Sequence, residues 1–137
     1  MSVPELSIQI KNIPGQVSQI TAILAEANVN IKAITASSTG KTGWVRIVVD
    51  NPKFAEEALD DCGYTVDTGE AIALYLPDEP GSLDRPLRLL ADAAINVDYI
   101  YTCAVAAKGQ IVIIGVQTPG KAEKLLVKEG IRLADIS

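Results

Sequence analysis

The chain has 137 residues, of which 48% are apolar and 21% charged, a composition typical of a folded soluble protein rather than a disordered one. Seventeen acidic residues against twelve basic ones give a net charge of −5, which argues against nucleic acid and anionic membranes as partners. Because the sequence contains no histidine, it excludes histidine-based catalytic triads and histidine-ligated metal sites, and we expect neither a metal nor a cofactor.

The first residues change from a strand pattern to a helix pattern at a Pro–Gly pair. Residues 6–11 alternate apolar and polar side chains, as in a half-buried strand. From Val17 to Ala27 the apolar side chains recur at helical spacing, and Asn28 suits the end of that helix. The pair Pro14-Gly15 is therefore predicted to join a strand to a helix.

A hairpin and a second helix follow. The pattern predicts a second strand, a turn, a third strand and a short closing strand at residues 31–35, 37–43, 44–49 and 64–67. Asn51 and Pro52 are a capping residue and a first helical residue, and Gly63 suits a left-handed helix end. These signals predict a helix between the third and fourth strands.

The second half of the chain repeats the first. Pro14-Gly15 recurs as Pro80-Gly81 at a spacing of 66 residues, and Val29-Asn30-Ile31 recurs as Ile95-Asn96-Val97 at the same spacing. Later in each copy the spacing becomes 67, as expected for one inserted residue. We predict an α+β protein made of two ferredoxin-like βαββαβ units in tandem, each an antiparallel sheet with both helices on one face. The predicted units are residues 1–69 and 70–137.

The sheet face away from the helices differs between the copies. In the first strand of the first copy the outward residues are polar: Ser7, Gln9 and Lys11. In the second copy they are Ala71, Ala73 and Tyr75, and Tyr99 and Tyr101 add to this surface if they face the same way. An apolar open face of this kind marks an interface, either between the two copies or in a homodimer.

Both strand-to-helix turns suit the binding of a small carboxylate. Backbone N–H groups at a helix start lack intrahelical partners, and glycine lets a ligand approach the main chain closely. Side chains that flank the entry to the second strand carry oxygens that accept hydrogen bonds from an ammonium group: Asn28 and Asn30 in the first copy, and Asn96 and Asp98 in the second. The pattern favours an amino acid zwitterion, although the same residue types also form ordinary turns and helix ends.

The twice-repeated pattern of a strand, a Pro–Gly turn and an apolar helix ending in Asn-Val-Asn-Ile or Ile-Asn-Val-Asp resembles the ACT domain, a small-molecule-binding regulatory module. Residues 83–100, LDRPLRLLADAAINVDYI, are especially similar to regulatory regions of aspartate kinases. The resemblance implies an amino acid bound at an interface between two copies, near the Pro–Gly turn and the strand after the first helix. It implies contacts from Asn12, Gly15, Gln16, Val17, Asn30, Ile31, Asp78, Gly81, Ser82, Leu83, Asn96, Val97 and Asp98.

From this resemblance we expect a non-catalytic amino acid sensor that forms a homodimer. The main alternative is a detachable regulatory subunit of an amino acid biosynthetic enzyme such as acetolactate synthase. An alternative from another class is a small ferredoxin-like enzyme that uses Tyr75, Tyr99, Tyr101 or Cys103. No stretch approaches the roughly eighteen apolar residues of a membrane span, and no leader pattern is present, so we expect a cytoplasmic location. Pro86 is expected to shift the start of its helix.

Overall fold

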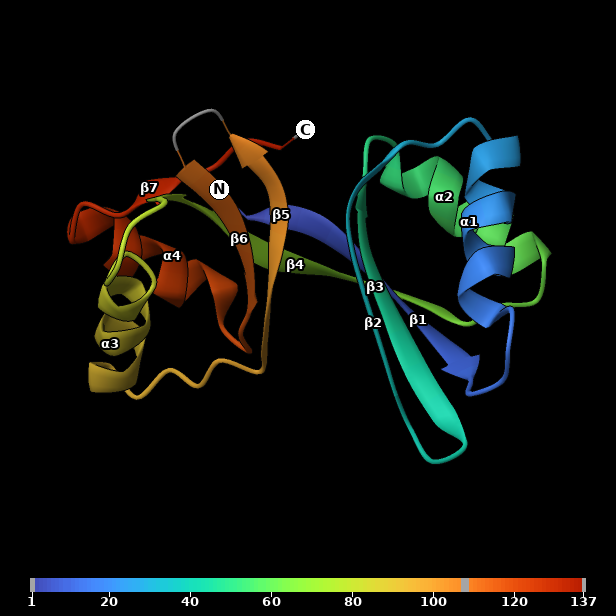
Figure 1. Ribbon diagram of the computed structural model, residues 1–137, viewed down its shortest axis with the longest axis horizontal. Helices are drawn as coiled ribbons and strands as arrows, with labels where there is room; N and C mark the ends of the chain where they lie inside the picture. The colour runs from blue at the N-terminus through green and yellow to red at the C-terminus, as the bar shows by residue number, and fades with distance from the viewer. Residues whose placement is uncertain (1, 107–108, 137) are drawn as a thin grey trace. The chain divides into compact units, whose positions relative to one another are not determined.

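The computed structural model describes residues 2–106 and 109–136, and the chain divides into two compact units. The N-terminal unit is Pro4–Gly69, and the C-terminal unit is Glu70–Ile136 together with Ser2 and Val3. Figure 1 shows that each unit carries its two helices together on one face of its own sheet. This is the predicted pair of ferredoxin-like units, and the fold prediction is confirmed.

The N-terminal unit follows the order βαββαβ. Its elements are β1 (Val3–Lys11), α1 (Gln16–Glu26), β2 (Ile31–Thr39), β3 (Thr42–Val49), α2 (Pro52–Asp61) and the first residues of β4 (Val66–Pro77). Strand β3 is antiparallel to both β1 and β2. On the other side of β1, the Gln9 N–H donates to the Thr65 carbonyl oxygen over 3.4 Å. The closing strand therefore lies next to β1, as the predicted topology requires.

The C-terminal unit repeats this arrangement. Its elements are the rest of β4, then α3 (Asp84–Asp92), β5 (Tyr99–Ala106), β6 (Gly109–Gly115), α4 (Pro119–Lys128) and β7 (Arg132–Leu133). Strand β4 is antiparallel to β6 and to β7, and β5 is antiparallel to β6. The sheet order in this unit is therefore β7-β4-β6-β5, the counterpart of the order in the first unit.

Each unit has its own hydrophobic core between sheet and helices. In the N-terminal unit Ile8 of β1 packs with Ile20 and Leu24 of α1, and in the C-terminal unit Leu74 of β4 packs with the helical Leu90; all are fully buried. Burying one such side chain contributes roughly 1.5–3 kcal/mol. Every second side chain of a strand is apolar, and these side chains all lie on one face of the sheet. The helices cover that face with their own apolar side chains, so the sequence pattern determines which face is buried.

Two strands differ in length from the prediction. Strand β2 continues to Thr39, so the predicted turn 37–43 shrinks to Gly40-Lys41, over which Thr39 and Thr42 pair. Gly40 has φ +65°, a backbone conformation that suits a two-residue hairpin loop. The closing strand of the first copy and the opening strand of the second form one strand, β4, because the single glycine between them, Gly69, does not interrupt it.

The start of α2 follows its predicted signals, α4 starts without a side-chain cap, and α3 starts late, as expected from Pro86. The Asn51 Oδ1 accepts a hydrogen bond from the Phe54 N–H over 3.2 Å, so this residue caps α2. Thr118 precedes the equivalent proline of α4 but its side chain makes no capping bond. Helix α3 begins at Asp84, two residues later than the position equivalent to the start of α1. Pro86 therefore falls within the first turn, where its missing N–H costs no intrahelical hydrogen bond.

The register of the C-terminal sheet settles the face of its tyrosines. Tyr101 pairs with Ile113, which pairs with Ala73, whereas the core residues Val112 and Leu74 occupy the alternate positions. The two tyrosines Tyr99 and Tyr101 therefore lie on the face opposite the helices, where their rings stack with centroids 6.2 Å apart. In the N-terminal unit the corresponding positions of β1 stay polar, as predicted.

Candidate functional site

Both Pro–Gly turns place a glycine in the left-handed region just before a helix. Gly15 has φ +88° and Gly81 has φ +87°, and open space surrounds the position that a Cβ would take at either one. Glycine is therefore required at both turns for the backbone conformation rather than for lack of room. The turns bend the end of β1 and the end of β4 back towards the starts of α1 and α3.

Each turn opens into a pocket that lies wholly within its own unit. The N-terminal pocket has a volume of about 480 Å³ and the C-terminal pocket about 560 Å³. Both are formed by the end of the first strand, the start of the first helix and the segment after the second helix. Their lining residues correspond through the repeat: Gln9, Gln16 and Gln19 to Tyr75, Ser82 and Arg85, and Gly63, Tyr64 and Thr65 to Gly130, Ile131 and Arg132.

Two uncharged side chains that line the N-terminal pocket are joined by a hydrogen bond. The Tyr64 hydroxyl donates to the Gln19 Oε1 over 2.6 Å. Burial raises the pKa of the Tyr64 hydroxyl above its usual value, with a smaller contribution from the nearby Cys62. Lys11 is the one charged side chain among the described residues that line this pocket.

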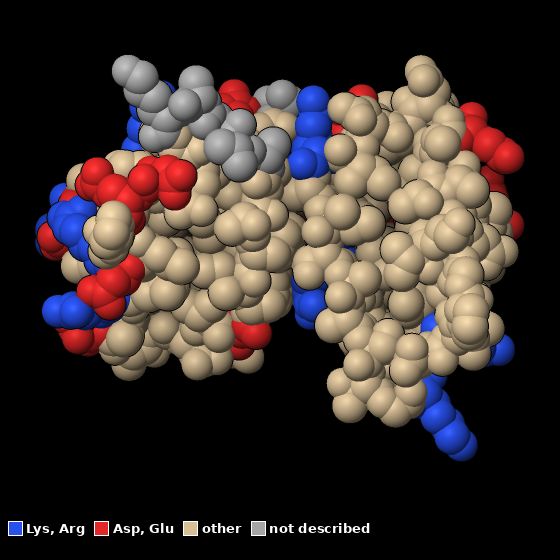
Figure 2. Space-filling model, in the orientation of Figure 1, with Lys and Arg blue, Asp and Glu red and all other residues tan. Residues whose placement is uncertain are grey.

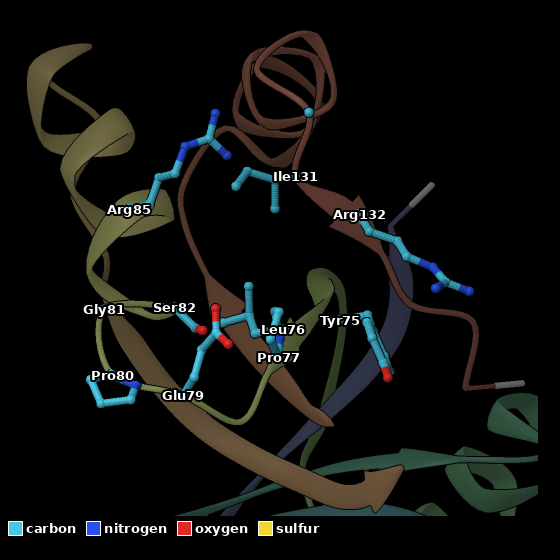
Figure 3. Close-up of a pocket in the computed structure, with 11 residues that line it drawn as sticks. Tyr75, Leu76, Pro77, Glu79, Pro80, Gly81, Ser82, Arg85, Ile131 and Arg132 are labelled. Atoms are coloured by element: carbon cyan, nitrogen blue, oxygen red, sulfur yellow. The ribbon is translucent and has the colours of Figure 1, made fainter. Parts of the chain in front are cut away.

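The C-terminal pocket carries charges of both signs on an apolar wall (Figure 3). Leu76 and Ile131 are buried and supply apolar lining. Figure 3 shows the Ser82 hydroxyl and the Glu79 carboxylate turned towards the middle of the cavity, with Arg85 on the α3 side and Arg132 at the opposite rim. A cavity of this volume, with an apolar wall and a few polar groups, is typical of small-molecule sites.

Both arginines of this pocket are held by neighbours. The Arg85 Nη2 donates to the carbonyl oxygen of Glu129, the C-cap of α4, over 2.5 Å. The Arg132 guanidinium lies 4.8 Å from the centre of the Tyr75 ring, a cation–π contact. A guanidinium has five N–H donors, so these contacts leave donors for a carboxylate.

Charges of both signs are also mixed over the outer surface of this unit. Figure 2 shows Lys and Arg side chains interspersed with Asp and Glu over α3 and α4 on the face in view.

Across the residues that the structure describes, no group of three or more Cys, Asp or Glu side chains is arranged to hold a metal ion. Within the same residues, no helix has the length and apolar character needed to cross a membrane.

A family model described as "ACT domain pair" matches residues 1–135. The chain belongs to the ACT domain pair family. ACT domains are regulatory modules, and the family assignment confirms the resemblance stated from the Pro–Gly pattern. No curated protein matches this ACT domain pair by sequence.

Solved structures share its fold over nearly the whole chain. Protein BT0572 from Bacteroides thetaiotaomicron is 25% identical with a TM-score of 0.90, and the match covers 98% of this chain and 92% of that one. The ligand-free regulatory subunit of aspartate kinase from Thermus thermophilus is 17% identical with a TM-score of 0.65, covering 91% and 90%. The same subunit from Thermus flavus is 15% identical with a TM-score of 0.61, covering 91% and 90%.

Three of the predicted contact residues of this ACT domain pair line the two pockets. They are Gln16, Gly81 and Ser82. Val17 and Leu83 stand at the helix starts and are both 36% exposed, and Gly15 and Asp78 are exposed in the turns. The Asn12 Nδ2 donates to the Gly40 carbonyl oxygen over 2.8 Å, so this side chain fastens the turn to the β2–β3 hairpin.

The other predicted contact residues lie at the opposite end of each sheet from their own turn. Lys11, the last residue of β1, pairs with Thr42, whereas Ile31 pairs with Val49, seven residues further along β3. That separation is about 23 Å along the strand. Within a single unit, one small ligand therefore does not span both groups. The residues at the far ends are Asn30, Ile31, Asn96, Val97 and Asp98.

These far residues make local hydrogen bonds at the sheet ends. The Asn30 N–H donates to the Asp50 Oδ1 over 3.0 Å, and the Asn96 Nδ2 donates to the Asp98 Oδ1 over 3.0 Å. The Asp98 N–H in turn donates to the Gly115 carbonyl oxygen over 2.8 Å. These bonds tie the start of the second strand to its neighbour in the sheet.

The sequence prediction missed the residues that give the C-terminal pocket its charge. Arg85 follows Gly81 by four residues, one helical turn, a spacing that places its side chain above the turn. Arg132 is related by the spacing of 67 to Thr65, a residue with no predicted role. A residue-by-residue comparison of the two copies identifies both positions, because each is uncharged in the first copy and an arginine in the second.

Proposed function

We propose that this ACT domain pair is a non-catalytic regulatory protein that binds an amino acid at the Pro–Gly turn of its C-terminal unit. The observation that carries the proposal is the pocket beside Gly81, in which Arg85 and Glu79 lie on one apolar wall. The family supports a regulatory role.

The chemistry of the pocket matches the two charged groups of an amino acid. A guanidinium donates paired N–H bonds to a carboxylate, and a carboxylate such as that of Glu79 accepts hydrogen bonds from an ammonium group. The buried Leu76 and Ile131 supply apolar surface for a side chain. If the protein has two conformations that differ in affinity for the amino acid, binding shifts the population towards the conformation with the higher affinity. The change in affinity for any partner protein cannot exceed the difference in ligand affinity between these two conformations.

The test is thermal unfolding of the full chain in the presence of each of the twenty common amino acids. An amino acid present at 100 times its dissociation constant stabilises the folded protein by about 2.7 kcal/mol. Glu79→Gln is expected to abolish that stabilisation, whereas Glu57→Gln, which changes an exposed carboxylate on α2, should retain it. If no amino acid raises the midpoint, amino acid binding is wrong.

A second candidate function is that of a detachable regulatory subunit of an amino acid biosynthetic enzyme. It is favoured by the likeness to two chains described as regulatory subunits of aspartate kinase, which match over about nine-tenths of both lengths. At 17% and 15% identity that likeness shows the fold alone. Adding the purified chain to aspartate kinase or acetolactate synthase from the same organism, with and without the ligand, tests whether it changes feedback inhibition.

The homodimer and the cytoplasmic location stay predictions from the sequence. Light scattering after size-exclusion chromatography, with and without the stabilising amino acid, measures the mass in solution.

A further inference from the structure

The two pockets are equivalent in position but differ in their charged side chains: Lys11 lines the N-terminal one, whereas two arginines and Glu79 line the C-terminal one. In the N-terminal pocket Gln19 and Thr65 occupy the places that Arg85 and Arg132 take in the C-terminal one. The chain has four arginines, and two of them line the C-terminal pocket. In a protein with a net charge of −5, two cations therefore line the C-terminal pocket, whereas Lys11 is the one cation among the described residues that line the N-terminal pocket.

Two polar side chains that line the N-terminal pocket are bonded to each other. The Tyr64 hydroxyl donates to the Gln19 Oε1, so these two polar groups satisfy each other rather than a ligand. The C-terminal equivalent of this tyrosine is Ile131, which has no hydroxyl to donate, and the equivalent of Gln19 is Arg85, which is turned to the Glu129 carbonyl oxygen. No side-chain hydrogen bond therefore joins the equivalent residues Ile131 and Arg85 of the C-terminal pocket.

The charges around the C-terminal pocket exceed what a neutral amino acid needs. One guanidinium is sufficient for the α-carboxylate and Glu79 for the α-ammonium, which leaves the second guanidinium without an anion. Arg132 lies at the rim beside the Tyr75 ring, on the other side of Ile131 from Arg85 (Figure 3). Figure 3 shows the Arg132 side chain directed outward from the rim, so a ligand with an anion at each end would meet Arg85 within the pocket and Arg132 at its mouth.

We propose that the C-terminal pocket binds an amino acid with an anionic side chain, and that the N-terminal pocket binds none. Arg85 and Glu79 take the α-carboxylate and the α-ammonium, the ligand's methylene groups lie on Leu76 and Ile131, and Arg132 takes the side-chain carboxylate. The pocket's net charge of +1 from these three residues matches the ligand's net charge of −1. This inference rests on the proposed function, since it names the class of amino acid that the same site takes.

The experiment is isothermal titration calorimetry of the full chain with L-glutamate and L-aspartate against their uncharged counterparts L-glutamine and L-asparagine, with L-leucine and inorganic phosphate as further probes. We expect one site per chain, and an acidic amino acid that binds at least tenfold more tightly than its amide, as expected for loss of a charge-assisted hydrogen bond. Arg132→Gln should remove this preference by weakening binding of the acidic amino acid at least tenfold. Arg88→Gln, on the same helix as Arg85 but outside this pocket, should leave the preference intact.

Five outcomes overturn the inference, and one of them also overturns the proposed function. Equal affinity for glutamate and glutamine, or tighter binding of leucine, removes the acidic ligand but keeps an amino acid site. Phosphate binding as tight as glutamate shows a general anion site. Two ligands per chain, with one lost in Gln19→Ala, shows that the N-terminal pocket also binds. If the unsubstituted protein unfolds cooperatively, and is therefore folded, but binds no amino acid, both proposals fail.

Discussion

Arg85 and Glu129 join the two helices of the C-terminal unit, with the Arg85 Nη2 2.5 Å from the Glu129 carbonyl oxygen. The bond links the first turn of α3 to the end of α4, and it holds the guanidinium at one wall of the pocket. In the N-terminal unit the same place is spanned by Gln19 and Tyr64, two side chains rather than a side chain and a carbonyl group.

Without ligand, Arg85→Gln is expected to lower the free energy of unfolding by about 1 kcal/mol, because a hydrogen bond from a charged donor to a helix-end carbonyl is lost. Arg88→Gln is the matched change on the same helix. It removes an ion pair with Asp84 whose side chains are 70% and 63% exposed, and such pairs contribute only about 0.3–0.5 kcal/mol. Urea unfolding of both variants measures the difference, and equal losses would contradict the interhelical role of Arg85.

Leu126→Ala is expected to lower the free energy of unfolding by about 2–5 kcal/mol, because this fully buried side chain leaves a cavity in the C-terminal core. Val127→Ala changes the next residue of the same helix, which is 53% exposed, and should cost less than about 0.5 kcal/mol. Urea unfolding measures both. A comparable loss in the two variants would show that α4 packs with a different face.

Gly81→Ala should destabilise the protein by about 1 kcal/mol, because an alanine in the left-handed conformation is strained although the space around it is open. Gly120→Ala, in the first turn of α4 with equally open surroundings, should be neutral or stabilising by up to about 0.5 kcal/mol. The midpoint of thermal unfolding reports both signs. A stabilising Gly81→Ala would show that the turn has a different backbone conformation.

Tyr64 is expected to make the protein less stable as the pH rises above 10. Its pKa is raised in the folded state from the ordinary value of 10.0, so the unfolded chain loses the proton first. Stability from this group is therefore fully present below pH 10 and is lost as the pH increases through the raised pKa. Thermal midpoints between pH 8 and pH 11 should fall less steeply in Tyr64→Phe than in the unchanged protein. Parallel curves would mean that burial does not perturb this hydroxyl.

The elements and their order were predictable because their signals are local. Strand alternation, the helical stripe and the cap at Asn51 each lie within a few residues of the structure they specify. The duplication then gave the number of units and their shared topology. The length of β4 was not predicted, because whether a strand continues past Gly69 depends on partners elsewhere in the sheet.

The sequence by itself determined that this protein is a pair of ACT-like βαββαβ units with a glycine-dependent turn at Gly15 and Gly81, because those features depend on period, repeat and backbone conformation. Only the tertiary structure decided which side chains surround each turn. Arg85 meets Glu129 across 44 residues and Tyr64 meets Gln19 across 45, contacts that no local pattern encodes. The physical reason is that pocket chemistry depends on the packing of the second helix against the first, which brings together residues from separate parts of the repeat.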